Sequence, residues 1–265
     1  MTRDELKHLH PRQIRELIRE GKFRDHTSGI GEGYTQANLV ILPKESAFDF
    51  LLFCQRNPKP CPVLEVTDPG SPLLKELADK ADLRTDLPKY RIYKKGELIN
   101  EVADIQNSWR DDLVGFLLGC SYTFEYALLN ANIPLRHVSE GKNVAMYITD
   151  IQCKPSGRFA GPMVVSMRPI HRDLVVRAIQ VTTRFPFTHG APIHFGDPEV
   201  IGIHDLEKVD FGEPVRIEPD EVPVFWACGV TPQAVALHAK LDFIITHSPG
   251  HMFISDIKDE ELAVL

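Results

Sequence analysis

The chain lacks an apolar run long enough to cross a bilayer. Its longest apolar stretches, residues 47–54 and 222–228, are far shorter than the roughly 20 residues of a transmembrane helix. The first 22 residues are highly charged and contain no apolar core of the kind that marks a secretory signal. We therefore expect no membrane partner and a cytoplasmic location.

The sequence also lacks a framework of paired cysteines. It has an odd number of them, and no two form the Cys-x-x-Cys pair that zinc ribbons use. Free thiols are typical of a reducing compartment, in agreement with the cytoplasm. The five cysteines are Cys54, Cys61, Cys120, Cys153 and Cys228.

No block of basic charge is present either. The formal net charge is -7, and acidic and basic residues are interspersed along the chain. A nucleic-acid partner is therefore not expected, because its phosphates must be neutralised by clustered Lys and Arg. With 265 residues, 43% of them hydrophobic, the chain can bury a substantial core without disulfides or metal ions.

The sequence predicts that the first 105 residues form a smaller α+β region. Apolar residues at helical spacing indicate a helix over residues 11–20. A second helix is expected over residues 44–56, with Phe48, Leu51 and Leu52 facing inward. A third is expected over residues 71–81, because it would begin with serine at the N-cap and proline in the first turn.

Residues 106–265 are predicted to form an α/β region, with a mixed sheet and flanking helices. Two helices are expected between residues 108 and 134, followed by alternating strands and helices. Residues 222–227 and 243–246 are apolar strands on either side of a helix. Such a crossover suits a parallel pair, so we expect these two strands to be neighbours.

The expected parallel pair indicates where a site should lie. In open α/β sheets, ligands bind outside the carboxyl ends of the strands. This rule selects residues 228–232 and residues 247–251, the loops that follow the two strands. The helix that begins at Thr231 would direct free backbone N–H groups into this space, which favours an anionic ligand.

The residues in these loops have more than one interpretation. Cys228 is either a small buried hydrophobic residue or a thiol activated by the helix N-terminus. His247 and His251 are four residues apart, but Pro249 and Gly250 prevent the regular helix on which they could share a metal. Acid–base catalysis, substrate binding and structural hydrogen bonding remain open for both histidines.

Other candidates are scattered along the chain. His189, His194 and Asp197 lie close together in sequence and carry groups that can bind a divalent metal, although their spacing matches no standard site. Arg110 either caps a helix or binds substrate. Arg168 is one of several arginines that could clamp a carboxylate through its planar guanidinium.

Three glycines, Gly29, Gly31 and Gly33, resemble a dinucleotide-binding loop. The required context is missing, because no strand precedes them and no helix clearly follows. We expect a flexible surface loop here.

Long segments spread over nearly the whole chain form a recognisable pattern. They are QANLVILP (36–43), FCQRNPKPCPVLEV (53–66), TDLPKYRIYKKGEL (85–98), WRDDLVGFLLGCSYTFEYAL (109–128), GPMVVSMRPI (161–170), HGAPIHFGDP (189–198), VPVFWACGVTPQ (222–233) and THSPGHMFISD (246–256). Together they closely resemble a bacterial family of hydro-lyases related to the D-glutamate cyclase domain of animal mitochondrial proteins. The loop DHTSGIGEGY (25–34) departs from the family, whose members tend to have a Gly-Pro-Thr type of loop there.

The resemblance implies a lyase that eliminates water, with D-glutamate closing to 5-oxo-D-proline as the best-defined activity. This reaction needs a base for the amine, a proton for the leaving oxygen and N–H donors for the oxyanion, but no redox cofactor. We assign the acid–base role to His247 or His251, with Asp256 as a further catalytic candidate. The expected substrate-binding residues are Arg110, Arg168, His189, His194, Cys228, Gly229 and Thr231.

Two alternatives stay open. One is a hydro-lyase for another small organic acid, with a divalent metal at His189, His194 and Asp197. The other is a non-catalytic protein that binds a carboxylate or a partner. We expect a small carboxylate as substrate, no metal and no cofactor, and a homo-oligomer is compatible with the sequence.

Overall fold

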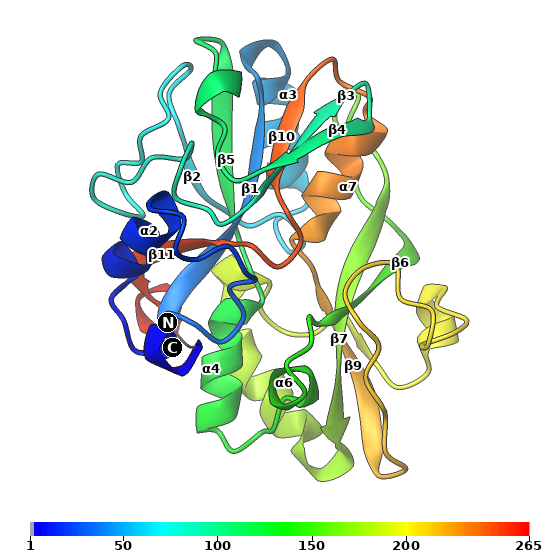
Figure 1. Ribbon diagram of the computed structural model, residues 1–265. Coiled ribbons are helices and arrows are strands. Elements are labelled where there is room, and N and C mark those ends of the chain that lie inside the picture. Colours follow the sequence, from blue (N-terminus) through cyan, green and yellow to red (C-terminus); the bar gives the residue numbers. More distant parts are fainter. Residues whose placement is uncertain (1–2, 265) are drawn as a thin grey trace.

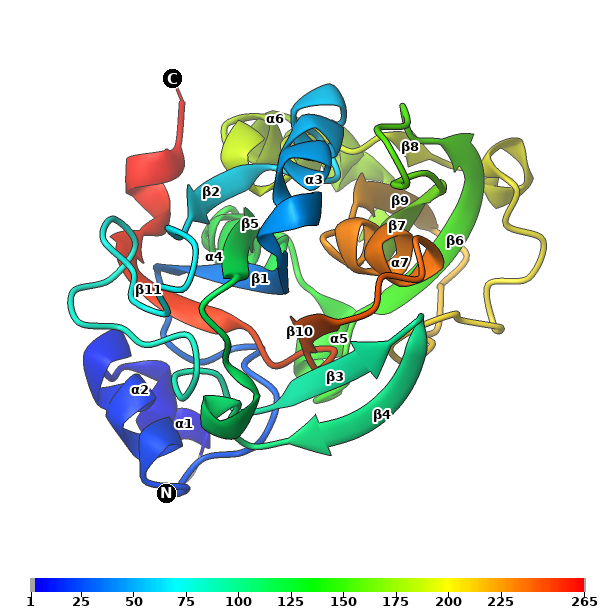
Figure 2. The same cartoon turned by 90° about the horizontal axis from the view of Figure 1, so that it is seen from above.

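The computed structural model describes residues 3–264, which form two antiparallel sheets with helices packed around and between them (Figure 1). The mixed α/β class is confirmed. In the larger sheet the strand order is β2-β5-β1-β10-β3-β4, and β11 also pairs with β1. The smaller sheet has the order β6-β7-β9-β8. Figure 2 shows β6, β7 and β9 on the side opposite β11.

The strands of the larger sheet are β1 (Tyr34–Pro43), β2 (Val63–Val66), β3 (Tyr90–Lys94), β4 (Glu97–Val102), β5 (Leu113–Gly119), β10 (Ile244–His247) and β11 (Phe253–Lys258). Those of the smaller sheet are β6 (Ala145–Gln152), β7 (Pro162–His171), β8 (His194–Phe195) and β9 (Glu221–Ala227). The α-helices are α1 (Arg3–Lys7), α2 (Pro11–Arg19), α3 (Lys44–Arg56), α4 (Tyr122–Asn130), α5 (Arg136–Ser139), α6 (Val175–Thr183) and α7 (Val230–His238). Within residues 3–264, no helix is long and apolar enough to cross a membrane.

Strand β1 is the centre of the larger sheet. It pairs with β5 from Ala37↔Gly119 to Pro43↔Leu113, and with β10 and β11 on its other edge. Leu39 and Ile41 pack into the core on one face of the sheet, whereas Val40 and Leu42 pack into the core on the other. This alternation explains why the strand is almost continuously apolar, since consecutive side chains point to opposite faces.

The predicted parallel pair is wrong. Strand β9 pairs with β7 and β8 in the smaller sheet, while β10 lies between β1 and β3 in the larger one. The order strand, helix, strand is present, but α7 passes from one sheet to the other. The rule for open parallel sheets therefore does not locate a site in this fold. The larger sheet also combines strands from both sides of residue 105.

Two helix predictions are wrong. Residues 71–81 form no helix, because the Glu65 carboxylate accepts hydrogen bonds from the backbone N–H groups of Lys75, Glu76 and Leu77. Part of the region predicted as two helices is instead strand β5, which is buried along its whole length between β1 and β2. Periodicity cannot separate a short buried strand from a buried helix.

The predicted helices over residues 11–20 and 44–56 are confirmed as α2 and α3. The prediction of which residues of α3 face inward is wrong. Phe48 and Leu51 are 73% and 40% exposed, whereas Phe50 and Phe53 are fully buried. The ring of Phe50 packs edge-on against those of Phe116 and Phe159, which fixes the rotation of the helix.

Candidate active site

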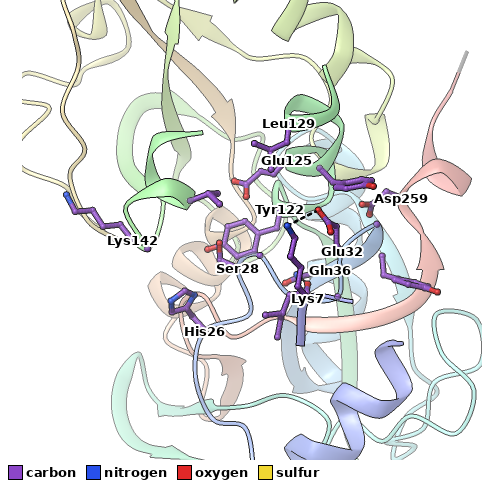
Figure 3. A pocket seen from close by; sticks show the side chains of 18 residues that line it. Lys7, His26, Ser28, Glu32, Gln36, Tyr122, Glu125, Leu129, Lys142 and Asp259 are labelled. Atoms are coloured by element: carbon purple, nitrogen blue, oxygen red, sulfur yellow. Dashed lines mark hydrogen bonds and ion pairs between the residues drawn. The ribbon is translucent and has the colours of Figure 1, made fainter. Parts of the chain in front are cut away.

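A cavity of about 320 Å³ lies between α4 and the glycine-containing loop that precedes β1. Its wall includes residues 28–34 of this loop. The prediction of a flexible surface loop is wrong, because Ser28, Ile30 and Gly31 are buried. Figure 3 shows Glu125 and Leu129 of α4 on one side of the cavity, with His26 and Asp259 toward opposite ends.

Hydrogen bonds hold this loop in place. The Thr27 backbone N–H donates to the Gly250 carbonyl at 2.7 Å, and the Thr27 hydroxyl accepts from the Met252 N–H at 3.0 Å. Gln36 Nε2 donates to the carbonyls of Thr27 and Ile30 at 3.0 and 3.1 Å. The segment around residues 247–252 therefore supports the cavity wall from behind.

Helix α4 brings Glu125 to the cavity. The helix begins after a tight turn at the end of β5, where Gly119 has no room for a side chain because the Phe187 carbonyl lies against it. Glu125 stands in the first turn of the helix, where the helix dipole favours a negative charge. Its side chain lines the cavity, although the residue is only 5% exposed.

All the hydrogen bonds that the Glu125 carboxylate forms within residues 3–264 involve one oxygen. Oε1 accepts from Arg168 Nε at 3.1 Å and from Arg168 Nη2 at 2.5 Å, and it lies 2.9 Å from His137 Nε2. Among residues 3–264, none donates to Oε2, which leaves this oxygen available to the cavity. Burial would raise the pKa of Glu125, but the opposing effects of His137 and Arg168 outweigh burial and lower it.

Arg168 lies on β7 and is fully buried. Besides Glu125, its guanidinium donates to the hydroxyls of Ser121 and Ser166, both at 3.0 Å. The rings of Phe124 and Trp226 lie 5.3 and 5.4 Å from its central carbon. The carboxylate that Arg168 binds in this structure is therefore that of Glu125.

A second carboxyl group of the cavity, Asp259, has the opposite electrostatic environment. It follows β11, its backbone N–H donates to the Gly33 carbonyl at 2.9 Å, and its Oδ1 accepts from the Thr35 hydroxyl at 3.3 Å. Burial is the main cause that raises the pKa of Asp259 to about 7. The cavity thus contains one carboxyl group with a lowered pKa and another that titrates near neutral pH.

Two lysines also line the cavity. Lys7 Nζ lies 3.5 Å from Glu32 Oε1, the contact drawn as a dashed line in Figure 3. Lys142 is bound elsewhere, because its Nζ lies 2.8 Å from Glu140 Oε2 and donates to the Pro214 carbonyl at 3.1 Å. The contact of Lys7 with Glu32 is thus longer than either contact of Lys142.

The predicted catalytic residues do not line this cavity. His247 is completely buried, and its Nδ1 accepts a hydrogen bond from the Leu39 backbone N–H at 3.0 Å. Burial lowers the pKa of His247 to about 3. His251 Nδ1 lies 2.9 Å from the Pro249 carbonyl, and burial also lowers its pKa. Asp256 forms a bidentate ion pair with Arg15, at 2.9 Å for each oxygen.

Helix α7, which follows residues 228–229, contacts His247 at the end of β10, although β9 and β10 lie in different sheets. Gln233 Nε2 is 2.6 Å from His247 Nδ1, and Gly229 lies so close to the Asn38 amide that a side chain would not fit. The Thr231 hydroxyl accepts from the Val164 N–H at 2.9 Å, which ties α7 to β7. These contacts favour a structural role for the two loops.

The thiol of Cys228 is buried 3.6 Å from the sulfur of Met146. Burial raises the pKa of Cys228 to about 11, so the thiol is protonated at neutral pH. These surroundings favour the interpretation of Cys228 as a small hydrophobic residue.

Each of the remaining predicted residues has its own hydrogen-bond or ion-pair partner. His189 Nδ1 lies 2.8 Å from the Lys59 carbonyl, and His194 Nε2 lies 2.6 Å from the Asp197 carbonyl. Burial lowers the pKa of His189 to about 4. Within residues 3–264, no three His, Cys, Asp or Glu side chains are arranged to hold a metal ion. Arg110 pairs with Asp112 before β5, whereas the cavity lies beyond the other end of that strand.

Sequence reasoning missed both carboxyl groups of the cavity. Glu125 gave a usable signal, because it is the one charged residue in the helix YTFEYALLN, and an isolated charge in an apolar helix is a candidate for a buried pair. Asp259 gave no such signal in the sequence, because it begins the acidic run DEEL, which is typical of a solvent-exposed surface.

Comparison with known proteins defines the class. The model of the D-glutamate cyclase family matches residues 114–256, a segment that includes Glu125 and ends three residues before Asp259. Proteins described as "putative hydro-lyase" are similar over nearly their full length. That of Thermoanaerobacter sp. (strain X514) is 67% identical over 96% of each chain, and that of Bacillus subtilis (strain 168) is 62% identical over 96% of this chain and 99% of its own.

These relatives identify the chain as an enzyme of the lyase class, as the sequence predicted. More narrowly, it belongs to the D-glutamate cyclase family.

Proposed function

We propose that this enzyme closes D-glutamate to 5-oxo-D-proline and water, and that the reaction takes place in the cavity between α4 and residues 28–34. The observation on which the proposal rests is the pair of carboxyl groups there, Glu125 and Asp259, with opposite pKa shifts. Environments that separate the pKa values of two nearby acids are a common basis for acid–base catalysis.

In the proposed reaction, Asp259 moves a proton. Its carboxylate takes one proton from the substrate ammonium, and the neutral amine then attacks the γ-carboxyl carbon. A carbon–nitrogen bond forms and a carbon–oxygen bond breaks. The departing oxygen receives the proton held by Asp259 and a second proton from the nitrogen, so that it leaves as water. A pKa of about 7 suits both halves of this transfer at neutral pH.

Lys7 is the proposed partner for a substrate carboxylate. Its contact with Glu32 is long at 3.5 Å, so an incoming carboxylate can replace it. We further propose a cytoplasmic location, which the buried free cysteines support.

Product analysis of the purified enzyme tests this function. D-glutamate, L-glutamate, D-aspartate and D-2-hydroxyglutarate are supplied separately, and the products are identified by NMR and chiral chromatography. We expect 5-oxo-D-proline from D-glutamate. Dehydration of a different acid would assign the enzyme to another hydro-lyase reaction, and no turnover of any amino or hydroxy acid would contradict the proposal.

A further inference from the structure

We infer that Glu125 Oε2 is the ammonium-binding atom of this cavity, and that Arg168 and His137 are positioning residues that direct it there. The inference rests on the proposed function for the identity of the substrate. It extends that function by naming the residue that makes the enzyme select amino acids over the corresponding hydroxy acids.

The Glu125 carboxylate is bound asymmetrically. Both Arg168 nitrogens and His137 contact Oε1, at 2.5 to 3.1 Å, and together they prevent the group from rotating. Because a carboxylate is planar, fixing Oε1 also fixes Oε2. In Figure 3 the carboxylate of Glu125 points from α4 toward the interior of the cavity.

The buried negative charge of Glu125 also favours a cationic ligand. A carboxylate buried to this extent is stable only with cationic or hydrogen-bonding partners, and Arg168 and His137 supply them on one side. Oε2 remains an unpaired acceptor with little exposure to water. A ligand cation with N–H donors satisfies it, whereas a hydroxyl offers one proton and no charge.

Gln36, another residue that lines the cavity, has an unpaired acceptor. Both hydrogen bonds of its Nε2 go to carbonyls of the loop. Its Oε1 is buried and has no hydrogen-bond partner within residues 3–264. A ligand that donates hydrogen bonds would satisfy such an acceptor, in agreement with an ammonium group at Glu125.

The binding of matched ligands tests the inference without requiring turnover. D-glutamate and D-2-hydroxyglutarate carry the same two carboxylates and differ in the ammonium or hydroxyl group. By calorimetry, we expect the intact enzyme to prefer D-glutamate. Glu125→Gln should weaken D-glutamate binding by about 10- to 100-fold, the scale of one charged hydrogen bond, and should change D-2-hydroxyglutarate binding much less.

The control is Glu97→Gln, which removes the same charge from an exposed residue of β4 outside this cavity and should leave both affinities unchanged. An unchanged preference in folded Glu125→Gln would overturn the inference, as would an intact enzyme that binds neither ligand or does not distinguish them. Amine preference without conversion of D-glutamate would instead contradict the proposed function alone.

A pH series separates positioning from mere structural support. Loss of His137 removes one of the two partners that lower the pKa of Glu125, so His137→Leu should weaken D-glutamate binding more at pH 5 than at pH 8. His137→Gln retains a donor for Oε1 and should recover part of the binding lost at pH 5. If His137→Leu weakened binding equally at both pH values, the positioning role would be excluded.

Discussion

Arg168 donates two hydrogen bonds to the same oxygen of Glu125, from Nε at 3.1 Å and from Nη2 at 2.5 Å. The contact joins β7 of the smaller sheet to α4, which packs against β1 of the larger sheet. One buried ion pair therefore connects the two sheets of the fold, and its carboxylate residue, Glu125, lines the cavity.

The first prediction concerns this ion pair. Arg168→Leu should lower the free energy of unfolding by about 3–5 kcal/mol, because it leaves the Glu125 carboxylate buried without its main partner. The double variant Arg168→Leu with Glu125→Leu should recover much of this loss. Urea denaturation of both variants measures the difference, and a fully stable single variant would contradict the buried-pair account.

The second prediction follows from the pKa of Asp259. The folded pKa of about 7 lies above the ordinary value of 3.8, so the stability due to this proton is complete below pH 3.8 and is lost as the pH rises through 7. The difference corresponds to about 4 kcal/mol at most. Asp259→Asn should therefore be more stable than the native enzyme at pH 8 and nearly equal to it at pH 4. Equal stability at both pH values would show that the carboxyl group is not perturbed.

The third prediction concerns acid stability. The pKa of His247 in the folded state, about 3, lies below 6.5, so its neutral form is favoured and stability is lost as the pH falls from 6.5 toward 3. His247→Asn keeps an acceptor for the Leu39 N–H and removes the titration. Between pH 6.5 and 4 it should lose less stability than the native enzyme does. The same slope in both proteins would rule out His247 as a cause.

The fourth prediction is that Cys228→Ser keeps most of its turnover. The thiol is buried and protonated at neutral pH, and the proposed ring closure contains no step for a nucleophilic sulfur. Assay of 5-oxoproline formation by the folded variant provides the measurement. An inactive but well-folded serine variant would require a covalent cysteine mechanism instead.

Parts of the fold could be predicted from the sequence where the local pattern and the tertiary packing agree. The helices α2 and α3 both follow from the spacing of apolar residues. The failures have identifiable causes. The predicted pairing of β9 with β10 is wrong, because the order of the elements along the chain does not determine which sheet each strand joins. The helix expected at residues 71–81 was replaced by long-range hydrogen bonds to Glu65.

The site was less predictable than the fold. Motif resemblance led to the correct family, but local chemistry directed attention to His247 and Cys228, which lie in buried structural contacts. Glu125 and Asp259 are 134 positions apart, and only the packing of α4 against β1 brings both to one cavity. Their pKa shifts come from burial and from partners elsewhere in the chain, which no single segment encodes.

The most direct test compares two variants in one assay of 5-oxo-D-proline formation from D-glutamate. Asp259→Asn removes the proposed proton carrier, and His251→Ala removes the histidine that the sequence favoured for the same role. We predict that Asp259→Asn lowers the turnover number by about 10²–10⁴-fold, the scale of a lost general acid or base, and that His251→Ala stays close to the native value. A nearly native Asp259→Asn with an inactive but folded His251→Ala would contradict the account and assign acid–base catalysis to the loop after β10.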